Sequence, residues 1–120
     1  MWLFLLGILF LSGFLASCTA AHDGSYAAHV WLDSNQNGKQ DQNEKPLTGV
    51  VIQIVNPSTG DLWTRSVTDD KGDIYLFSAG GTCGQYNLYL SVPEGYWPTT
   101  PVVANTPHCE TAQFGLRQSQ

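Results

Sequence analysis

Oxygen-bearing side chains stand at alternate positions around one glycine between residues 33 and 44. Calcium-binding loops of twelve residues place Asp first, Asp or Asn third and fifth, Gly sixth and Glu last. This segment has that order around Gly38, with a backbone carbonyl available at the seventh position and a carboxylate at the ninth. The sequence therefore predicts a calcium site with the ligands Asp33, Asn35, Asn37, Lys39, Asp41 and Glu44. The alternative is a polar surface loop that binds no ion.

The segments on either side of this loop predict strands. Residues 28–32 precede it, and residues 50–55 follow it with five β-branched side chains, which suit a pleated surface. Pro46 and Gly49 would break a helix within its first turn. The loop is therefore expected to join two strands, the first two of the domain.

A longer pattern surrounds the loop and identifies a family. It reads Val30-Trp31-Leu32-Asp33-x-Asn35-x-Asn37-Gly38-x-x-Asp41-x-x-Glu44-x-Pro46-Leu47-x-Gly49-Val50. This pattern resembles the opening of the B-type repeat of bacterial serine-aspartate-repeat surface proteins. The resemblance continues to about residue 116 through three turn motifs, which are Thr68-Asp69-Asp70-Lys71-Gly72, Gly84-Gln85-Tyr86 and Pro93-Glu94-Gly95-Tyr96.

The resemblance implies a calcium-binding β-sandwich of the prealbumin-like kind that serves as a stalk segment or a ligand-presenting module rather than as an enzyme. One departure affects the strand after Gly72, where the family has Tyr and Phe but this chain has Ile74 and Leu76. The aromatic residues Tyr75 and Phe77 are shifted by one. Since a one-residue shift moves every side chain to the opposite face, either pair is a candidate for the core.

Short β-rich runs separated by turn residues fill the rest of the chain, as in a sandwich. We expect an all-β domain of about seven strands over residues 28–117, with a frayed C-terminus at 118–120. Length alone allows one domain.

The chain begins with an apolar run that ends at Leu15-Ala16-Ser17-Cys18. The run is too short to span a membrane, so residues 1–17 are expected to form an export signal. The last four residues resemble a bacterial lipobox, which predicts that Cys18 is lipidated and that residues 18–27 form a flexible tether. The alternative is ordinary cleavage after Ala20 or Ala21 and a secreted product.

Cys83 and Cys109 remain after Cys18 is set aside. In an exported protein two cysteines most simply form a disulfide. The alternatives are two free thiols, or a metal site with His108, although no Cys-x-x-Cys motif is present.

The acidic balance of the chain, with ten Asp and Glu against five Lys and Arg, argues against nucleic acid as a partner. No Gly-x-Ser-x-Gly, phosphate-loop or His-Glu-x-x-His motif points to catalysis, so we expect no enzyme activity. Asp69 and Asp70 are candidates for a second cation site, or for a hairpin turn.

These observations favour a calcium-stabilised structural or adhesive module. It would be held by a lipid anchor on the bacterial cell envelope, where its partner would be a surface protein or a polysaccharide. The alternative is a carbohydrate- or ligand-binding lipoprotein that uses exposed aromatic side chains. The candidates for such a platform are Trp63, Tyr89, Tyr96 and Trp97.

Overall fold

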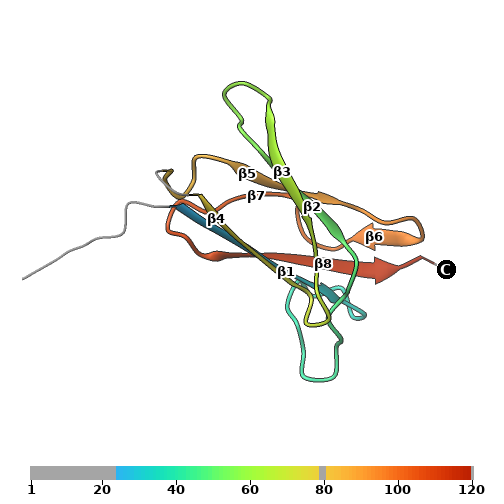
Figure 1. The fold of residues 1–120 in the computed structure, drawn as a ribbon. Helices are drawn as coiled ribbons and strands as arrows, with labels where there is room; N and C mark the ends of the chain where they lie inside the picture. Colours follow the sequence, from blue (N-terminus) through green and yellow to red (C-terminus); the bar gives the residue numbers. More distant parts are fainter. Residues whose placement is uncertain (1–23, 79–80, 120) are drawn as a thin grey trace, which may run out of the picture.

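The computed structural model describes residues 24–78 and 81–119, and that part of the chain consists of strands and turns (Figure 1). Eight strands are present, one more than the sequence predicted. They are β1 (Gly24–Leu32), β2 (Val51–Val55), β3 (Leu62–Val67), β4 (Asp73–Ser78), β5 (Asn87–Ser91), β6 (Tyr96–Pro98), β7 (Val103–Asn105) and β8 (Thr111–Gln118). No helix in the described ranges is long and apolar enough to cross a membrane.

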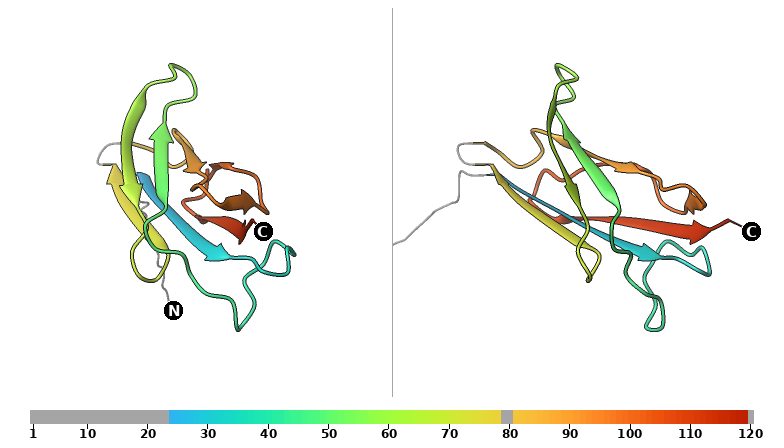
Figure 2. Two further views of the ribbon diagram at one scale, coloured as in Figure 1. Left: turned by 90° about the vertical axis from the view of Figure 1, so that its right-hand side faces the viewer. Right: turned by 45° about the vertical axis from the view of Figure 1, so that its right-hand side comes forward.

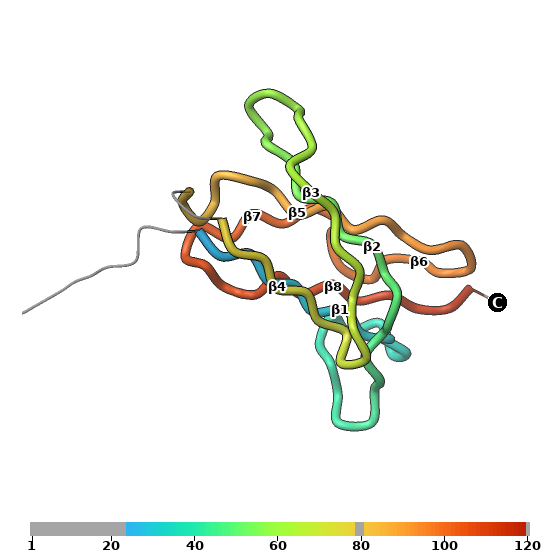
Figure 3. Tube along the Cα trace, in the orientation of Figure 1, coloured from blue at the N-terminus to red at the C-terminus, as the bar shows by residue number. Residues whose placement is uncertain are grey.

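The strands form two four-stranded sheets that face each other, in the orders β4-β1-β8-β6 and β3-β2-β5-β7 (Figure 3). All neighbours pair antiparallel except β1 and β8, which run parallel from Ala27↔Thr111 to Leu32↔Leu116. The first and last strands are therefore side by side at the centre of one sheet. The predicted all-β sandwich is confirmed.

The core lies between the sheets and follows the alternation of each strand. β2 buries Ile52 and Ile54, and β8 buries Phe114 and Leu116, while their neighbours on the strand mostly face outward. In β4, Ile74 is buried and Leu76 packs against the core, whereas Tyr75 and Phe77 are exposed. Ile74 and Leu76 thus take the inward positions, and the question left open by the sequence is answered.

Three boundaries differ from those predicted. β1 begins at Gly24, because Tyr26 is fully buried and Ser25 to His29 pair with β4, so residues 24–27 belong to the domain and not to a tether. The turn-rich segment after Pro93 contains β6, a short edge strand that pairs with the end of β8. This pairing keeps Gln118 in a strand, and Ser119 donates to the Gly95 carbonyl, so the chain is ordered up to residue 119 rather than frayed.

β1 and β8 place the described chain ends at opposite ends of the sandwich (Figure 2). Gly24 lies at one end, and the loop after Leu32 lies with the end of β8 at the other. We call the latter the loop end. The predicted signal at residues 1–17 and Cys18 lie outside the described residues.

Candidate metal centre

The loop at residues 33–44 starts where β1 ends and is held at both of its ends. The Asp33 amide donates to the Leu116 carbonyl (2.6 Å), which ties the start of the loop to β8. Its return segment runs back along β1, where the Leu32 amide donates to the Lys45 carbonyl and the Leu47 amide to the Val30 carbonyl. The loop therefore joins two strands, as predicted, and backbone hydrogen bonds to β1 and β8 hold its two ends in place.

Five of the six predicted ligand residues have side chains in one hydrogen-bond network. The buried Asp33 carboxylate accepts the amides of Asn37 (3.2 Å) and Gly38 (2.8 Å). The Glu44 carboxylate accepts the amides of Asn35 (3.3 Å) and Asp41 (3.0 Å) across the loop. The loop sequence thus folds so that its carboxylates point inward, toward backbone N–H groups.

The two asparagines complete the ring. Asn35 and Asn37 both donate their side-chain amides to Asp41 Oδ2, and the side-chain Oδ1 of Asn37 accepts the Lys39 backbone amide (3.0 Å). N–H donors therefore face the loop carboxylates and offset part of their negative charge. Within residues 24–78 and 81–119, no three Asp, Glu, His or Cys side chains gather closely enough to hold a metal by themselves. A cation in this loop would need the amide and backbone oxygens that the pattern includes.

Gly115 supports Asp33 from β8 through a close approach. A Cβ at residue 115 would lie 2.5 Å from Thr99 Oγ1, 3.1 Å from the Trp31 ring and 3.2 Å from Asp33 Cβ. Only glycine at position 115 lets the side chains of Trp31 and Asp33 approach the β8 backbone this closely. No sequence pattern indicates this role, because the contact joins residues far apart in the chain.

His29 connects the loop to the start of β4. Its Nδ1 lies 2.6 Å from Asp73 Oδ1, and its Nε2 lies 2.6 Å from Gln40 Oε1. Gln40 in turn donates its side-chain amide to the Glu44 carbonyl (3.2 Å). The imidazole also stacks on the Trp31 ring, with 6.1 Å between ring centres. The alternation of His29 with Trp31 and Asp33 puts the three residues on one side of the chain, and this spacing was the available sequence signal for the support.

Asp69 acts within its own turn. Its Oδ1 accepts the amides of Lys71 (2.9 Å) and Asp73 (3.0 Å), and these donors hold the pKa of Asp69 below its ordinary value. The carboxylate thus closes the turn between β3 and β4. These strands lie in different sheets, so the turn connects the two sheets and is not the hairpin turn that the sequence predicted. The second cation site at Asp69 and Asp70 stays a prediction.

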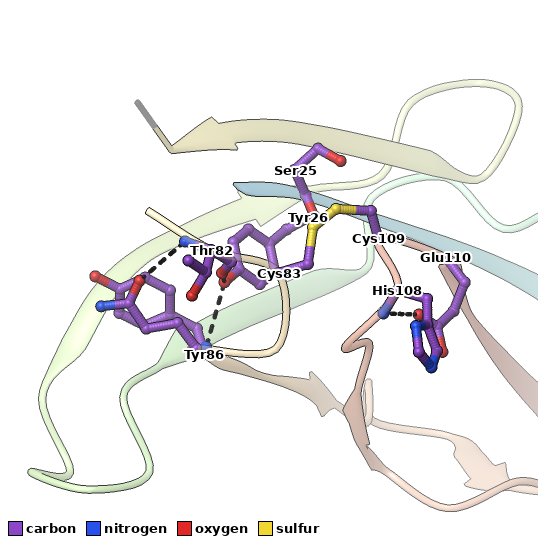
Figure 4. Close-up of a disulfide and its surroundings, with 9 residues drawn as sticks. Ser25, Tyr26, Thr82, Cys83, Tyr86, His108, Cys109 and Glu110 are labelled. Carbon is purple, nitrogen blue, oxygen red and sulfur yellow. Dashed lines mark hydrogen bonds between the residues drawn. A yellow bond between two sulfur atoms is a disulfide. The ribbon is translucent and has the colours of Figure 1, made fainter. Parts of the chain in front are cut away.

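The opposite end of the sandwich is closed by a disulfide between Cys83 and Cys109 (Figure 4). It joins the loop before β5 to the loop before β8, and so excludes the alternatives of free thiols and a Cys-His metal site. Beside it, the Tyr26 hydroxyl donates to the Thr82 carbonyl (2.5 Å) and accepts the Tyr86 amide (3.3 Å). Burial raises the pKa of Tyr26, which keeps the phenol protonated as a donor.

The four aromatic residues considered for ligand stacking do not form one platform. Trp63 of β3 packs on Tyr86 (5.1 Å between ring centres) and Tyr26. Tyr96 packs against the core, and Tyr89 lies on β5 in the other sheet. Trp97, 55% exposed on β6, lies at the loop end, beside the Arg117 guanidinium.

A sequence model of the SdrD B-like domain matches residues 22–113, most of the chain. The chain belongs to this family. The family start at residue 22 agrees with the early start of β1, and the match contains the complete candidate calcium loop.

Relatives of this SdrD B-like domain include serine-aspartate repeat-containing protein C of Staphylococcus aureus, strains Newman and USA300. Each is 44% identical over 72 residues, which is 60% of this chain and 7% of the relative. The chain therefore spans a small fraction of these relatives.

Solved structures with the same fold include the shaft pilin SpaA of Lactobacillus rhamnosus GG, with a TM-score of 0.58 and 16% identity over 82% of this chain and 50% of the pilin. A single-residue variant of that pilin gives a TM-score of 0.62, with 15% identity over 83% of this chain and 52% of the pilin. At this identity the likeness establishes the fold of the SdrD B-like domain and nothing further.

Proposed function

We propose that this SdrD B-like domain is a non-enzymatic structural or adhesive module of the bacterial cell envelope, stabilised by calcium at residues 33–44. The observation that carries the proposal is the closed loop that connects the carboxylates of Asp33, Asp41 and Glu44 at one end of the sandwich. Family membership and the naming of relatives as serine-aspartate repeat-containing proteins support it.

The arrangement of the end strands suits a structural role. A pull between Gly24 and Gln118 acts along the parallel β1–β8 pair and loads its hydrogen bonds together rather than one at a time. The loop is attached to both of these strands, through Asp33 to β8 and through residues 45–47 to β1. Calcium in the loop would therefore reinforce the strands that carry the load.

The donor set suits calcium. Three carboxylates, two asparagine carbonyl oxygens and the Lys39 backbone carbonyl offer oxygen atoms only, which hard cations prefer. Two of the side chains are neutral, so the affinity is expected in the extracellular class, with a Kd of roughly 0.1–1 mM. Magnesium should substitute poorly, since it requires a small octahedral shell.

Calcium at about 1 mM is expected to stabilise the domain by roughly 0.4–1.4 kcal/mol at this affinity. The Tm should rise by a few degrees, and a chelator should reverse the rise. Glu44→Gln removes a charge and an oxygen donor from the site, and it should abolish the calcium-dependent shift while the domain stays folded. Differential scanning calorimetry with and without calcium measures both quantities.

Glu94→Gln is the matched control, because Glu94 is exposed in the turn before β6 and, in the described part of the chain, makes no hydrogen bond to residues 33–44. This variant should keep the full calcium shift. An unchanged Tm and no heat of binding at millimolar calcium in the unsubstituted protein would leave the loop as a polar connection between strands.

Cys18 is proposed as the lipid attachment site, in a stretch that lies outside the described residues. Expressed in its host, the protein should partition with membranes and incorporate labelled palmitate, and Cys18→Ser should abolish both. Cys83→Ser is the control, since it removes a cysteine without touching the lipobox. Soluble protein with an N-terminus at Ala21 or His22 would contradict lipidation.

A further inference from the structure

A polar pocket opens at the loop end, between the first half of the loop and the end of β8. It is lined by Leu32, Ser34, Gln36, Arg117 and Gln118, and its volume is about 200 Å³. Ligand pockets for drug-sized molecules usually begin at about 300 Å³, so this one fits a single ring or a small charged group. It lies apart from the inward-pointing carboxylates of the loop.

Ser34 and Gln36 occupy the second and fourth positions of the loop, which the calcium pattern does not use as ligands. Gln36 has a φ of 59°, a left-handed conformation that is unfavourable for a residue with a side chain. Its amide donates to the Asp33 carbonyl (3.1 Å), which helps to hold it there. Backbone strain of this kind gathers at binding sites, and here it places an amide side chain on the pocket wall.

Arg117 supplies the only full charge in the pocket lining. Among the described residues the one ion pair joins His29 and Asp73, so Arg117 has no acidic partner there. Its guanidinium carbon lies 5.7 Å from the centre of the Trp97 ring, which orients the group without neutralising it. In a chain with net charge −5, an arginine without an acid beside a pocket favours an external anion.

We propose that this pocket binds a carboxylate-bearing sugar ring of an acidic saccharide, such as a uronate or a sialate. Arg117 pairs with the carboxylate. Ser34, Gln36 and Gln118 both donate and accept hydrogen bonds, as sugar hydroxyls do. Trp97, which is 55% exposed beside Arg117, offers a flat apolar face to a neighbouring ring. An apolar peptide side chain would need an apolar wall, and Leu32 is the one apolar residue in the lining.

The proposal does not rest on calcium binding, and the test is run with calcium present and again with chelator. NMR titration of the labelled protein with D-glucuronate or N-acetylneuraminate should shift the amides of residues 32–36, 117 and 118 and the Trp97 indole. For one ring in a shallow site we expect a Kd on the order of 1–10 mM. Glucose should give no saturable shift, since it lacks the carboxylate.

Arg117→Gln should weaken binding about ten-fold or more, because it removes the charged donors. Arg65→Gln is the control, since Arg65 is exposed on β3 in the other sheet and its substitution removes the same charge. An unchanged Tm shows that a variant is folded.

Three results would overturn the proposal. The first is the absence of a saturable shift at about 50 mM of either acidic sugar, in calcium and in chelator alike. The second is equal binding by the Arg117→Gln variant. The third is an equal response to N-acetylglutamate, which would assign the pocket to acidic peptides instead.

Discussion

Gly72→Ala is expected to destabilise the domain by about 3 kcal/mol or more. Gly72 has a φ of 78°, and a Cβ there would lie 2.4 Å from the Val30 carbonyl oxygen and 2.9 Å from Pro46 Cβ. The left-handed conformation costs roughly 1–2 kcal/mol in a residue with a side chain, and a clash with fixed backbone adds about 1–3 kcal/mol.

The clash cannot relax, because two segments meet on Val30. The Val30 amide donates to the Gly72 carbonyl (2.8 Å), and the Val30 carbonyl accepts the Leu47 amide (2.9 Å). Moving residue 72 therefore separates the start of β4, or the return segment of the loop, from β1. In a domain of this size 3 kcal/mol lowers the Tm by about 12–24 °C, which thermal unfolding followed by circular dichroism measures.

Gly60→Ala separates the two contributions. Gly60 has nearly the same φ, 79°, but no atom beyond its two chain neighbours lies within 4 Å of the position its Cβ would take. The control should lose only the conformational share, about 1–2 kcal/mol. Equal losses in the two variants would show that residue 72 has room for a side chain, which the contacts around Val30 exclude.

The features of this domain that could be predicted are those encoded by neighbouring residues in the sequence. Alternation in residues 50–55 and 84–92 places β2 and β5, and the order of oxygen-bearing residues from Asp33 to Glu44 gives the loop that the structure closes on itself. Such features depend on neighbours a few residues apart, so composition and spacing reveal them.

The features that could not be predicted depend on contacts across the fold. β6 has only three residues and contains Pro98, and it forms a strand because the end of β8 offers it a partner. The sequence around Gly72 left two faces of β4 possible, and packing of Ile74 and Leu76 against the core decides between them. Gly115 supports the loop from β8, through an approach to Trp31 and Asp33 that no spacing rule describes.

The exposed side chains of β4 also show that residue type alone does not predict which face of a strand is buried. Tyr75 is 67% exposed and Phe77 56% exposed, although aromatic residues in a short strand suggest a core face. Ile74 and Leu76 occupy the interior instead, and one alternating strand cannot present both pairs inward.

Removal of the Cys83–Cys109 disulfide is expected to cost about 3 kcal/mol. The two cysteines are 26 residues apart in sequence and their Cα atoms lie 5.2 Å apart. In the chain-entropy model, opening a loop of this length returns that much conformational freedom to the unfolded chain. Cys83→Ala/Cys109→Ala should therefore lower the Tm by about 12–24 °C.

Reductant gives the matched comparison, since it should lower the Tm of the unsubstituted protein by a similar amount and leave the double variant unchanged. Mass spectrometry of a non-reduced digest should find the peptides of Cys83 and Cys109 linked. Two alkylatable thiols in freshly exported protein would contradict the bond.

The double variant should nevertheless keep the calcium-dependent Tm shift proposed for residues 33–44. Cys83 Sγ lies near the Ser25 carbonyl at the start of β1, whereas the proposed calcium loop begins at Asp33, directly after the end of β1 and about 25 Å away along it. Sites this far apart that share no partner contribute additively to stability, within about 0.5 kcal/mol. Loss of the calcium shift in the double variant would mean that the disulfide end positions the loop through β1, and that the two ends of the sandwich do not act independently.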